Sequence, residues 1–169
     1  MKITAITILL LVIGLSGCSG TIPGLKKRTA VRGDDLAITL VRNACYGTCP
    51  VYELTIDADG NVTFDGRKHT KTLGKAAGKI SGNEIDRLIT EFNAVGFLEL
   101  NDNYDQNNCP SFATDMSTIA ISLRQNGQTK TVVHNLGCST KGDHKPYPPG
   151  LSELAKKIDE AARTAQWIK

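Results

Sequence analysis

The stretch VYELTIDADGNVTF, residues 51–64, decides how this chain folds, because it places two short alternating strands around a turn. Apolar and polar side chains alternate on both sides, which is typical of half-buried β-strands. A two-residue turn at Asp59-Gly60 would set Val62 and Phe64 on the polar face. A three-residue loop at 58–60 instead pairs residue 56 with 62 and gives Gly60 a left-handed conformation. The second register gathers the apolar side chains on one face, and we predict it: Tyr52, Leu54, Ile56, Val62 and Phe64.

Outward from this hairpin, the sequence predicts a third strand and a first helix. Residues 36–41 form a short apolar run before the hairpin, typical of a strand. After it, Ser81 and Glu84 have the spacing of a helix capping box, and Gly96 is placed to end the helix. Between them, apolar residues recur at helical spacing: Ile85, Leu88, Ile89, Phe92 and Val95. The basic stretch at 67–79 fits a solvated loop or an edge strand.

A second hairpin and a second helix complete the predicted elements. Residues 117–123 and 129–136 flank Asn126-Gly127, a preferred type I′ turn. Behind the Pro-Pro-Gly at 148–150, apolar residues again follow helical spacing: Leu151, Leu154, Ala155, Ile158 and Ala162. We therefore expect a two-layer α+β domain, in which an antiparallel sheet built from β-hairpins carries both amphipathic helices on one face.

The N-terminal residues resemble the signal peptide of a bacterial lipoprotein. Lys2 precedes a largely apolar run at 3–15, which has the length of a signal-peptide core and is too short to span a bilayer. The next residues, Leu15-Ser16-Gly17-Cys18, resemble a lipobox, which implies cleavage before Cys18 and acylation of that cysteine with lipid such as palmitate. An ordinary secretory signal is the alternative. We expect an exported protein that is lipid-anchored to a membrane. If the cell is Gram-negative, Ser19 resembles the outer-membrane sorting pattern, and the expected place is the periplasmic side of the outer membrane.

We divide the chain into a signal peptide at 1–17, a lipidated cysteine with a flexible tether at 18–35, and one α+β domain at 36–169. Of the 20 Lys and Arg residues, five precede residue 36, and of the 17 Asp and Glu residues, two do, which leaves 15 of each in the domain. A neutral domain lacks the basic surface of a nucleic-acid-binding protein. We expect no nucleic-acid partner.

Four cysteines remain once Cys18 is assigned to lipid. An even number in an exported protein favours disulfides, and four cysteines allow three pairings. Cys45 and Cys49 flank a Gly-containing turn, which can bring their Cα atoms within the roughly 4.4–6.8 Å that a disulfide needs. Cys109 precedes one strand of the second hairpin and Cys138 follows the other, so both should lie at its open end. We predict the pairs Cys45–Cys49 and Cys109–Cys138.

Motifs for catalysis or metal binding do not stand out. A four-cysteine zinc site would need two short Cys spacings and a redox pair would need C-x-x-C, whereas the chain has one C-x3-C. His69, His134 and His144 belong to no hydrolase or metalloprotease motif, and we expect His134 to be a half-buried strand residue. The segment NDNYDQNN, residues 101–108, fits plain turns better than a calcium loop. We predict no catalytic residue, metal or cofactor.

The loop Tyr46-Gly47-Thr48, held between two cysteines, is the most defined surface feature that the sequence predicts. A rigid loop suits recognition, because little conformational entropy remains to be lost when it binds. These three residues are our candidate recognition loop.

The run CYGTCPVY, residues 45–52, followed by DADGNV, residues 57–62, resembles the family catalogued as domain of unknown function 6438. Its members share C-[FY]-G-x-C-P-x-Y, a D-G hairpin, a capped helix ending in a Gly/Ala-Phe turn, and a Thr-Asp before the next strand. Here those last two features are Gly96-Phe97 and Thr114-Asp115, and the C-terminal QWI at 166–168 also fits. The resemblance extends over about residues 37–168. It implies an envelope lipoprotein and no particular activity.

Together these patterns predict a membrane-anchored cell-envelope lipoprotein with a non-catalytic binding domain, whose partner is an envelope protein or glycan. The alternative is a thiol- or metal-dependent envelope enzyme that uses the Cys45–Cys49 loop with a nearby histidine.

Overall fold

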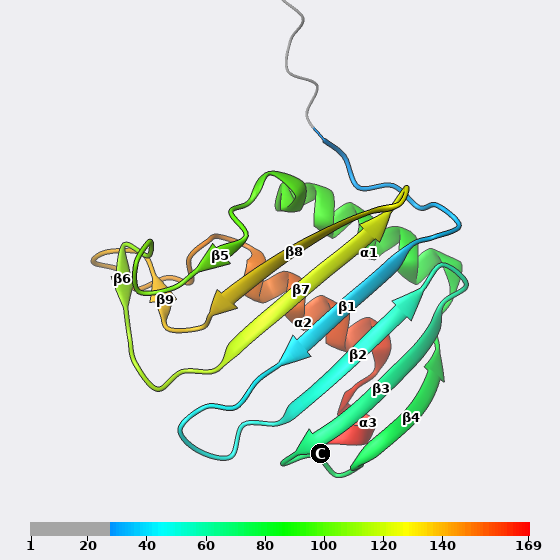
Figure 1. Ribbon diagram of the computed structural model, residues 1–169, viewed down its shortest axis with the longest axis horizontal. Helices are drawn as coiled ribbons and strands as arrows, with labels where there is room; N and C mark the ends of the chain where they lie inside the picture. Colours follow the sequence, from blue (N-terminus) through cyan, green and yellow to red (C-terminus); the bar gives the residue numbers. More distant parts are fainter. Residues whose placement is uncertain (1–27) are drawn as a thin grey trace, which may run out of the picture.

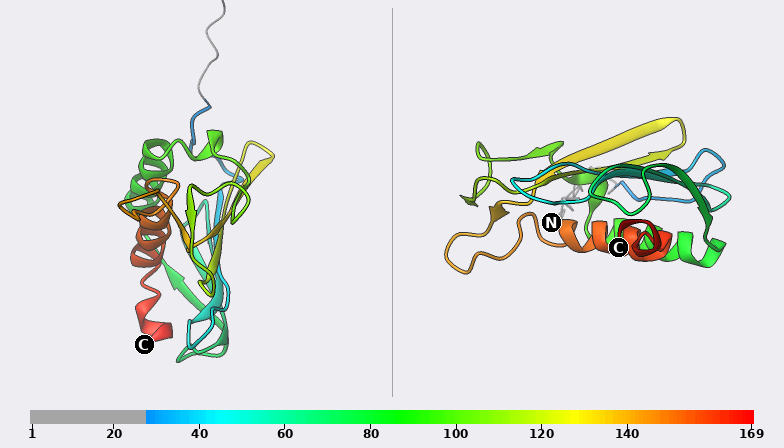
Figure 2. Two further views of the ribbon diagram at one scale, coloured as in Figure 1. Left: turned by 90° about the vertical axis from the view of Figure 1, so that its left-hand side faces the viewer. Right: turned by 90° about the horizontal axis from the view of Figure 1, so that it is seen from below.

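The computed structural model describes residues 28–169, so the expected signal peptide, the lipid-attachment residue Cys18 and the first part of the tether lie outside the described residues. The domain has two layers, a twisted seven-stranded sheet and a layer of helices on one of its faces (Figures 1 and 2). The predicted α+β class, with a mainly antiparallel sheet and two long helices on one face, is confirmed. Within residues 28–169, no helix has the length and apolar character needed to cross a bilayer.

The strands of the large sheet lie in the order β4-β3-β2-β1-β7-β8-β5, and the pairing is antiparallel except between β5 and β8. Their bounds are β1 (Ala37–Arg42), β2 (Val51–Asp57), β3 (Asn61–Lys68), β4 (Gly74–Lys79), β5 (Asn103–Tyr104), β7 (Thr118–Gln125) and β8 (Gln128–Asn135). A small second sheet pairs β6 (Ser111–Phe112) with β9 (Cys138–Ser139). The helices are α1 (Gly82–Ala94), α2 (Leu151–Ala162) and the short α3 (Ala165–Ile168), and the 3-10 turn η1 (Phe97–Glu99) follows α1.

The hairpin of β2 and β3 has the predicted three-residue loop. Ile56 lies opposite Val62 and Leu54 lies opposite Phe64, so their side chains point together into the core. Gly60 has a φ of 83°, the left-handed conformation that the loop requires. A Cβ atom on Gly60 would also collide with the carbonyl oxygen of Ile80, whose own N–H donates to the carbonyl of Gly60 at 2.8 Å.

The two long helices close the core from the other side. α1 begins with the predicted capping box, in which the backbone N–H of Glu84 donates to the Ser81 hydroxyl and the Glu84 carboxylate accepts from the Ser81 N–H at 2.7 Å. The apolar stripes of α1 and α2 are buried against the sheet. At the β3 side, the ring of Trp167 in α3 stacks on Phe64 with 4.9 Å between ring centroids. The apolar faces of α1 and α2 therefore belong to the hydrophobic core.

The second hairpin also follows its predicted turn, because Asn126 and Gly127 both have positive φ, at 51° and 71°. It departs from the prediction at His134, which was expected to be half-buried and is instead fully buried. His134 lies on the core face opposite Ile119, and β8 is not the last strand of the sheet, because the two-residue strand β5 pairs with it and places Tyr104 edge-on to the His134 ring. The basic stretch at 67–79 was predicted to be either a solvated loop or an edge strand. It contains β4, which is an edge strand of the large sheet.

The described part of the expected tether packs against the domain. Ala30 is buried, and its N–H and carbonyl bond to the side-chain amide of Asn93 at 2.7 and 3.0 Å. The Asp35 carboxylate accepts the N–H groups of Asn126 and Gly127 at 2.8 and 2.6 Å. Residues 28–35 thus pack against the domain, on the N-terminal side of the expected boundary at residue 36. The tertiary bonds that hold this segment leave no local pattern in its sequence.

Replacing Gly60 by Ala should destabilise the domain by about 3 kcal/mol, because a positive φ and a steric clash both oppose the new methyl group. Gly127→Ala is the matched control. Gly127 has a similar φ but nothing within 4 Å of its Cβ position, so we expect a cost of about 1 kcal/mol. Urea unfolding of both variants measures the difference, and equal costs would contradict the steric role of Ile80.

Candidate functional site

Both predicted disulfides are present. Cys45 and Cys49 are bonded with their Cα atoms 5.7 Å apart, and Cys109 and Cys138 are bonded with 5.4 Å between Cα atoms. The first disulfide closes the loop between β1 and β2. The second ties the chain before β6 to the end of the β8 hairpin, where both cysteines were expected.

The disulfide-closed loop presents Tyr46 to solvent. The Tyr46 side chain is 91% exposed, and Gly47 and Thr48 are exposed beside it. The loop also leans on the segment before β7, since the backbone N–H of Tyr46 donates to the carbonyl of Asp115 at 3.1 Å. The candidate recognition loop is therefore ordered at its backbone and open at its side chains.

The stems of this loop are clamped by one carboxylate. Arg42, at the end of β1, lies directly opposite Tyr52 of β2, and both bind Asp159 of α2. Arg42 donates from Nε and Nη2 to Asp159 Oδ2 at 2.8 and 2.6 Å. The Tyr52 hydroxyl donates to Asp159 Oδ1 at 2.6 Å, and the Thr164 hydroxyl donates to the same oxygen at 3.1 Å. We call these four residues the Asp159 clamp.

The electrostatics of the Asp159 clamp fit a structural role. The Arg42 and Asp159 side chains are only 23% and 15% exposed. Burial alone would lower the pKa of Arg42, but the facing Asp159 carboxylate raises it above its usual value. Burial raises the pKa of Tyr52, and the negative charge of Asp159 raises it further. Arg42 therefore stays charged and Tyr52 stays neutral, and both carboxylate oxygens of Asp159 are occupied by these partners.

Sequence reasoning missed the Asp159 clamp, because Arg42 and Asp159 are 117 residues apart. One signal was available. The predicted register places Tyr52 on the core face, and a buried tyrosine hydroxyl needs a hydrogen-bond partner.

Exposed apolar side chains gather at the same end of the sheet as the disulfide loop. Strand register brings together the loops at 43–50, 69–73 and 113–117, and we call this end of the sheet the loop end (Figure 1). Among the described residues, the loop end carries three of the four large apolar side chains that are exposed: Tyr46, Leu73 at 68% and Met116 at 48%. The fourth, Val31, lies at the opposite end beside the β7–β8 turn, where its N–H donates to Gln125.

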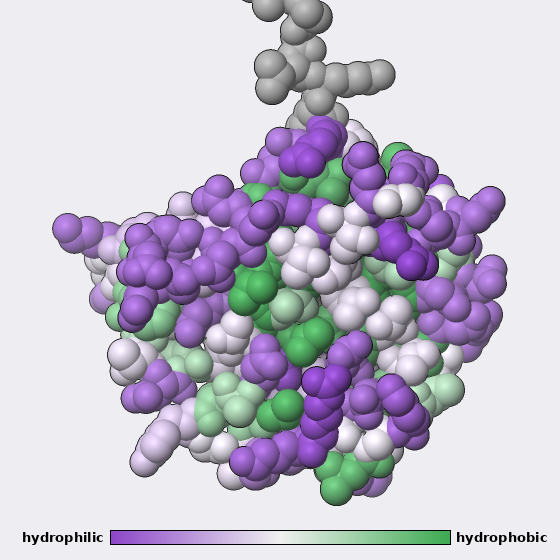
Figure 3. All heavy atoms as spheres, viewed as in Figure 1, coloured by the Kyte–Doolittle hydropathy of each residue, from purple (hydrophilic) through white to green (hydrophobic). Residues whose placement is uncertain are grey.

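The sheet face that the helices leave open has a different character. Figure 3 shows neutral and apolar residues mixed over its middle, with hydrophilic residues around them. Hydroxyl pairs join neighbouring strands on this face, Thr39 with Thr55 at 3.1 Å and Ser122 with Thr131 at 2.8 Å. These side chains satisfy one another, so the loop end is the better candidate for a recognition surface.

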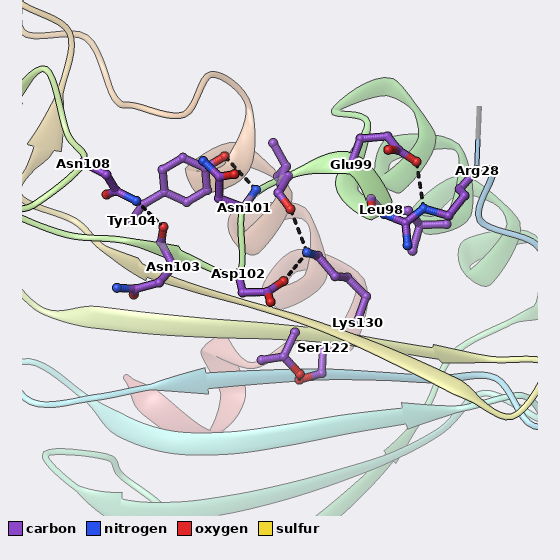
Figure 4. A network of polar contacts seen from close by, with 12 residues as sticks. Arg28, Leu98, Glu99, Asn101, Asp102, Asn103, Tyr104, Asn108, Ser122 and Lys130 are labelled. Carbon is purple, nitrogen blue, oxygen red and sulfur yellow. Dashed lines mark hydrogen bonds and ion pairs between the residues drawn. The ribbon is translucent and has the colours of Figure 1, made fainter. Parts of the chain in front are cut away.

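The Asn- and Asp-rich segment at 101–108 is a turn network. Asp105 accepts the backbone N–H of Asn107 at 2.8 Å, and the Asn108 side chain donates to the Asn103 carbonyl at 2.7 Å. Lys130 of β8 donates to the Leu100 carbonyl at 2.6 Å and pairs with Asp102 (Figure 4). Hydrogen bonding and the positive charge of Lys130 lower the pKa of Asp102.

The histidines lie in separate environments. His69 lies in the β3–β4 turn at the loop end, and both it and His144 are exposed. His134 is buried on the core face of β8, beside Tyr104 of β5. Within residues 28–169, no three His, Cys, Asp or Glu side chains are grouped closely enough to hold a metal ion.

Comparison with known proteins identifies the family. Residues 36–162, well over half of the chain, match the domain of unknown function DUF6438, and the chain belongs to this family. A comparison with curated proteins found no match. Two stretches that carry the resemblance to this family meet at the loop end: residues 45–52 and Thr114-Asp115. They are joined by the hydrogen bond from the Tyr46 N–H to the Asp115 carbonyl.

Replacing Asp159 by Asn should destabilise the domain by about 2–3 kcal/mol, because it leaves the partly buried Arg42 guanidinium without its counter-charge. Glu160→Gln, which weakens only the exposed pair with Lys156, is the control and should cost less than about 0.5 kcal/mol. Urea unfolding checks both values. Similar small costs for the two variants would show that the Asp159 clamp contributes little.

Proposed function

We propose that this member of the DUF6438 family is a membrane-anchored cell-envelope lipoprotein, and that its domain binds a partner through the loop end without catalysing a reaction. The lipobox at residues 15–18 supports the anchor. The two disulfides fit an oxidising compartment outside the cytoplasm. An envelope protein or glycan is the expected partner.

The observation that carries the binding role is the exposure of Tyr46 on a loop that is fixed from both sides. The Cys45–Cys49 disulfide closes the loop, and the Asp159 clamp holds its stems through Arg42 and Tyr52. An aromatic side chain on a pre-ordered backbone gives a large contact area for a small entropic cost. Tyrosine is also among the residues that dominate binding energy at protein interfaces.

The arrangement of the two ends supports the same role. The chain enters the domain at Arg28, whose guanidinium pairs with Glu99 at 2.9 Å at the end of the sheet opposite the loop end. A membrane anchor that precedes Arg28 therefore attaches on that side. Tyr46, Leu73 and Met116 lie at the other end of the sheet, so the point at which the chain enters the domain leaves them accessible to a partner.

Tyr46→Ala should weaken capture of the partner at least tenfold, because it removes the most exposed aromatic side chain of the loop end. The measurement is a crosslinking pull-down from native membranes with the intact lipoprotein, quantified by mass spectrometry. Val31→Ala is the matched control, since Val31 is an exposed apolar residue at the opposite end. The binding role through the loop end is wrong if both variants capture the same proteins and glycans in the same amounts as the wild type.

Cys18→Ala should abolish incorporation of labelled palmitate and move the protein from the membrane fraction to the soluble fraction, because it removes the proposed lipid-bearing thiol. Cys45→Ser with Cys49→Ser is the control, in which two other cysteines are lost but the label should remain. Unchanged labelling of the Cys18 variant would refute the anchor and leave the binding role to be judged separately.

A further inference from the structure

His134 is a buried histidine without an ordinary hydrogen bond. Its side chain lies on the core face of β8, opposite Ile119 of β7 and beside Tyr104 of β5. The residue is fully buried, and neither Nδ1 nor Nε2 has a hydrogen-bond partner. Buried polar atoms are nearly always paired in folded proteins, so an imidazole left unpaired in a core calls for an explanation.

The surroundings of His134 favour its neutral form. The titratable groups that face it are the phenol of Tyr104, edge-on with ring centroids 6.4 Å apart, and Tyr147 of the segment before α2, which packs against Tyr104. β7 contributes only the apolar Ile119. Burial lowers the pKa of His134, and the backbone of Tyr147, which lies close to the imidazole but outside normal hydrogen-bond geometry, raises it by less. No charged side chain of the sheet or the helix layer acts on it.

The strand beside His134, whose Tyr104 ring packs edge-on against the imidazole, has the shortest pairing in the large sheet. β5 has two residues and pairs with β8 along one edge only. It is attached through the N–H of Val133, which donates to the Asp102 carbonyl at 2.8 Å, and through Lys130 (Figure 4). The Asp102 side chain is 85% exposed, so its ion pair with Lys130 is screened by water and weak. Apart from the buried Tyr104 ring, few contacts hold β5 in place, which is typical of segments that open locally.

The second disulfide limits how far this segment travels. Cys109, shortly after β5, is bonded to Cys138, shortly after β8. Residues 101–108 thus form a short flap fixed at both ends, by η1 on one side and by the disulfide on the other. A displacement of this flap would leave the pairing of β1 with β2 and β7 in place.

We propose that β5 and its flanking residues 101–108 form an acid-operated latch, in which protonation of buried His134 releases Tyr104 and β5 from the edge of β8. In the open state the N–H of Val133 is no longer bonded to the Asp102 carbonyl, and the Tyr104 ring leaves the core. The latch works whether or not the loop end binds a partner of its own.

The direction of the pH effect follows from where the proton binds. In the closed state the pKa of His134 lies below its ordinary value of about 6.5, and in the open state water restores that value. The open state therefore binds the proton more tightly. Above about pH 6.5, protonation of His134 does not shift the equilibrium between the closed and open states. Below that pH, the equilibrium constant for closing falls about tenfold for each pH unit, until His134 is protonated in the closed state as well.

Amide hydrogen exchange on the mature chain tests the latch. Between pH 7.5 and 5.5, after correction for intrinsic exchange, the protection factor of the Val133 amide should fall about tenfold. The amide of Leu40, in the central strand β1, should keep its protection, because the opening is local. An unchanged Val133 protection factor, or an equal loss at Leu40, would overturn the proposal.

Variants identify the group responsible. His134→Leu should remove the pH-dependent loss of protection at the Val133 amide. The double variant His69→Gln, His144→Gln should retain that loss, since both of those histidines are exposed. A loss that persists in His134→Leu overturns the latch. Should that variant not fold, an NMR titration of the wild-type imidazoles decides instead: the latch requires that His134 and the Val133 exchange rate change over the same pH range, and separate ranges overturn it.

Discussion

The carboxylate of Asp159 is the contact on which the arrangement of the loop end depends. It joins α2 to Arg42 at the end of β1 and to Tyr52 in β2, both more than 100 residues earlier in the chain, and it also accepts from the nearby Thr164. Because Arg42 and Tyr52 flank the loop at 43–50, the same contact that docks the helix layer onto the sheet also fixes the stems of that loop. The Cys45–Cys49 disulfide then closes its tip. Burial of the Arg42–Asp159 pair makes this clamp costly to break.

The two ends of the sheet have different roles in this account. At one end, residues 28–35 are bonded to Asn93 and to the β7–β8 turn, so the chain enters the domain along a fixed path. At the other end, the disulfide loop displays Tyr46. The β5 edge adds a third feature, because the pKa of His134, which lies beside Tyr104 of β5, is lowered by burial. The proposed recognition surface and the proposed latch thus lie on separate parts of one small fold.

Much of the fold was predictable from local patterns. Alternation around Gly60 identified the register of β2 and β3, since a two-residue loop would have placed Val62 and Phe64 on the polar face. The ends of the second hairpin correctly paired Cys109 with Cys138. What escaped prediction depends on contacts between distant residues. Two-residue strands such as β5 show no periodicity. No sequence pattern therefore indicated that Tyr104 of β5 packs beside the fully buried His134. The Asp159 clamp and the docking of Asp35 likewise join side chains to partners far along the chain.

The central claim is that the loop at 43–50 is ordered before it meets a partner. Backbone ¹⁵N relaxation of the mature chain in solution measures this directly at the amides of Tyr46, Gly47 and Thr48. A loop fixed by the Asp159 clamp and the Cys45–Cys49 disulfide should give order parameters of about 0.8 or higher, close to those of the flanking strands. Values below about 0.6 at these three amides would show a flexible loop and contradict the claim.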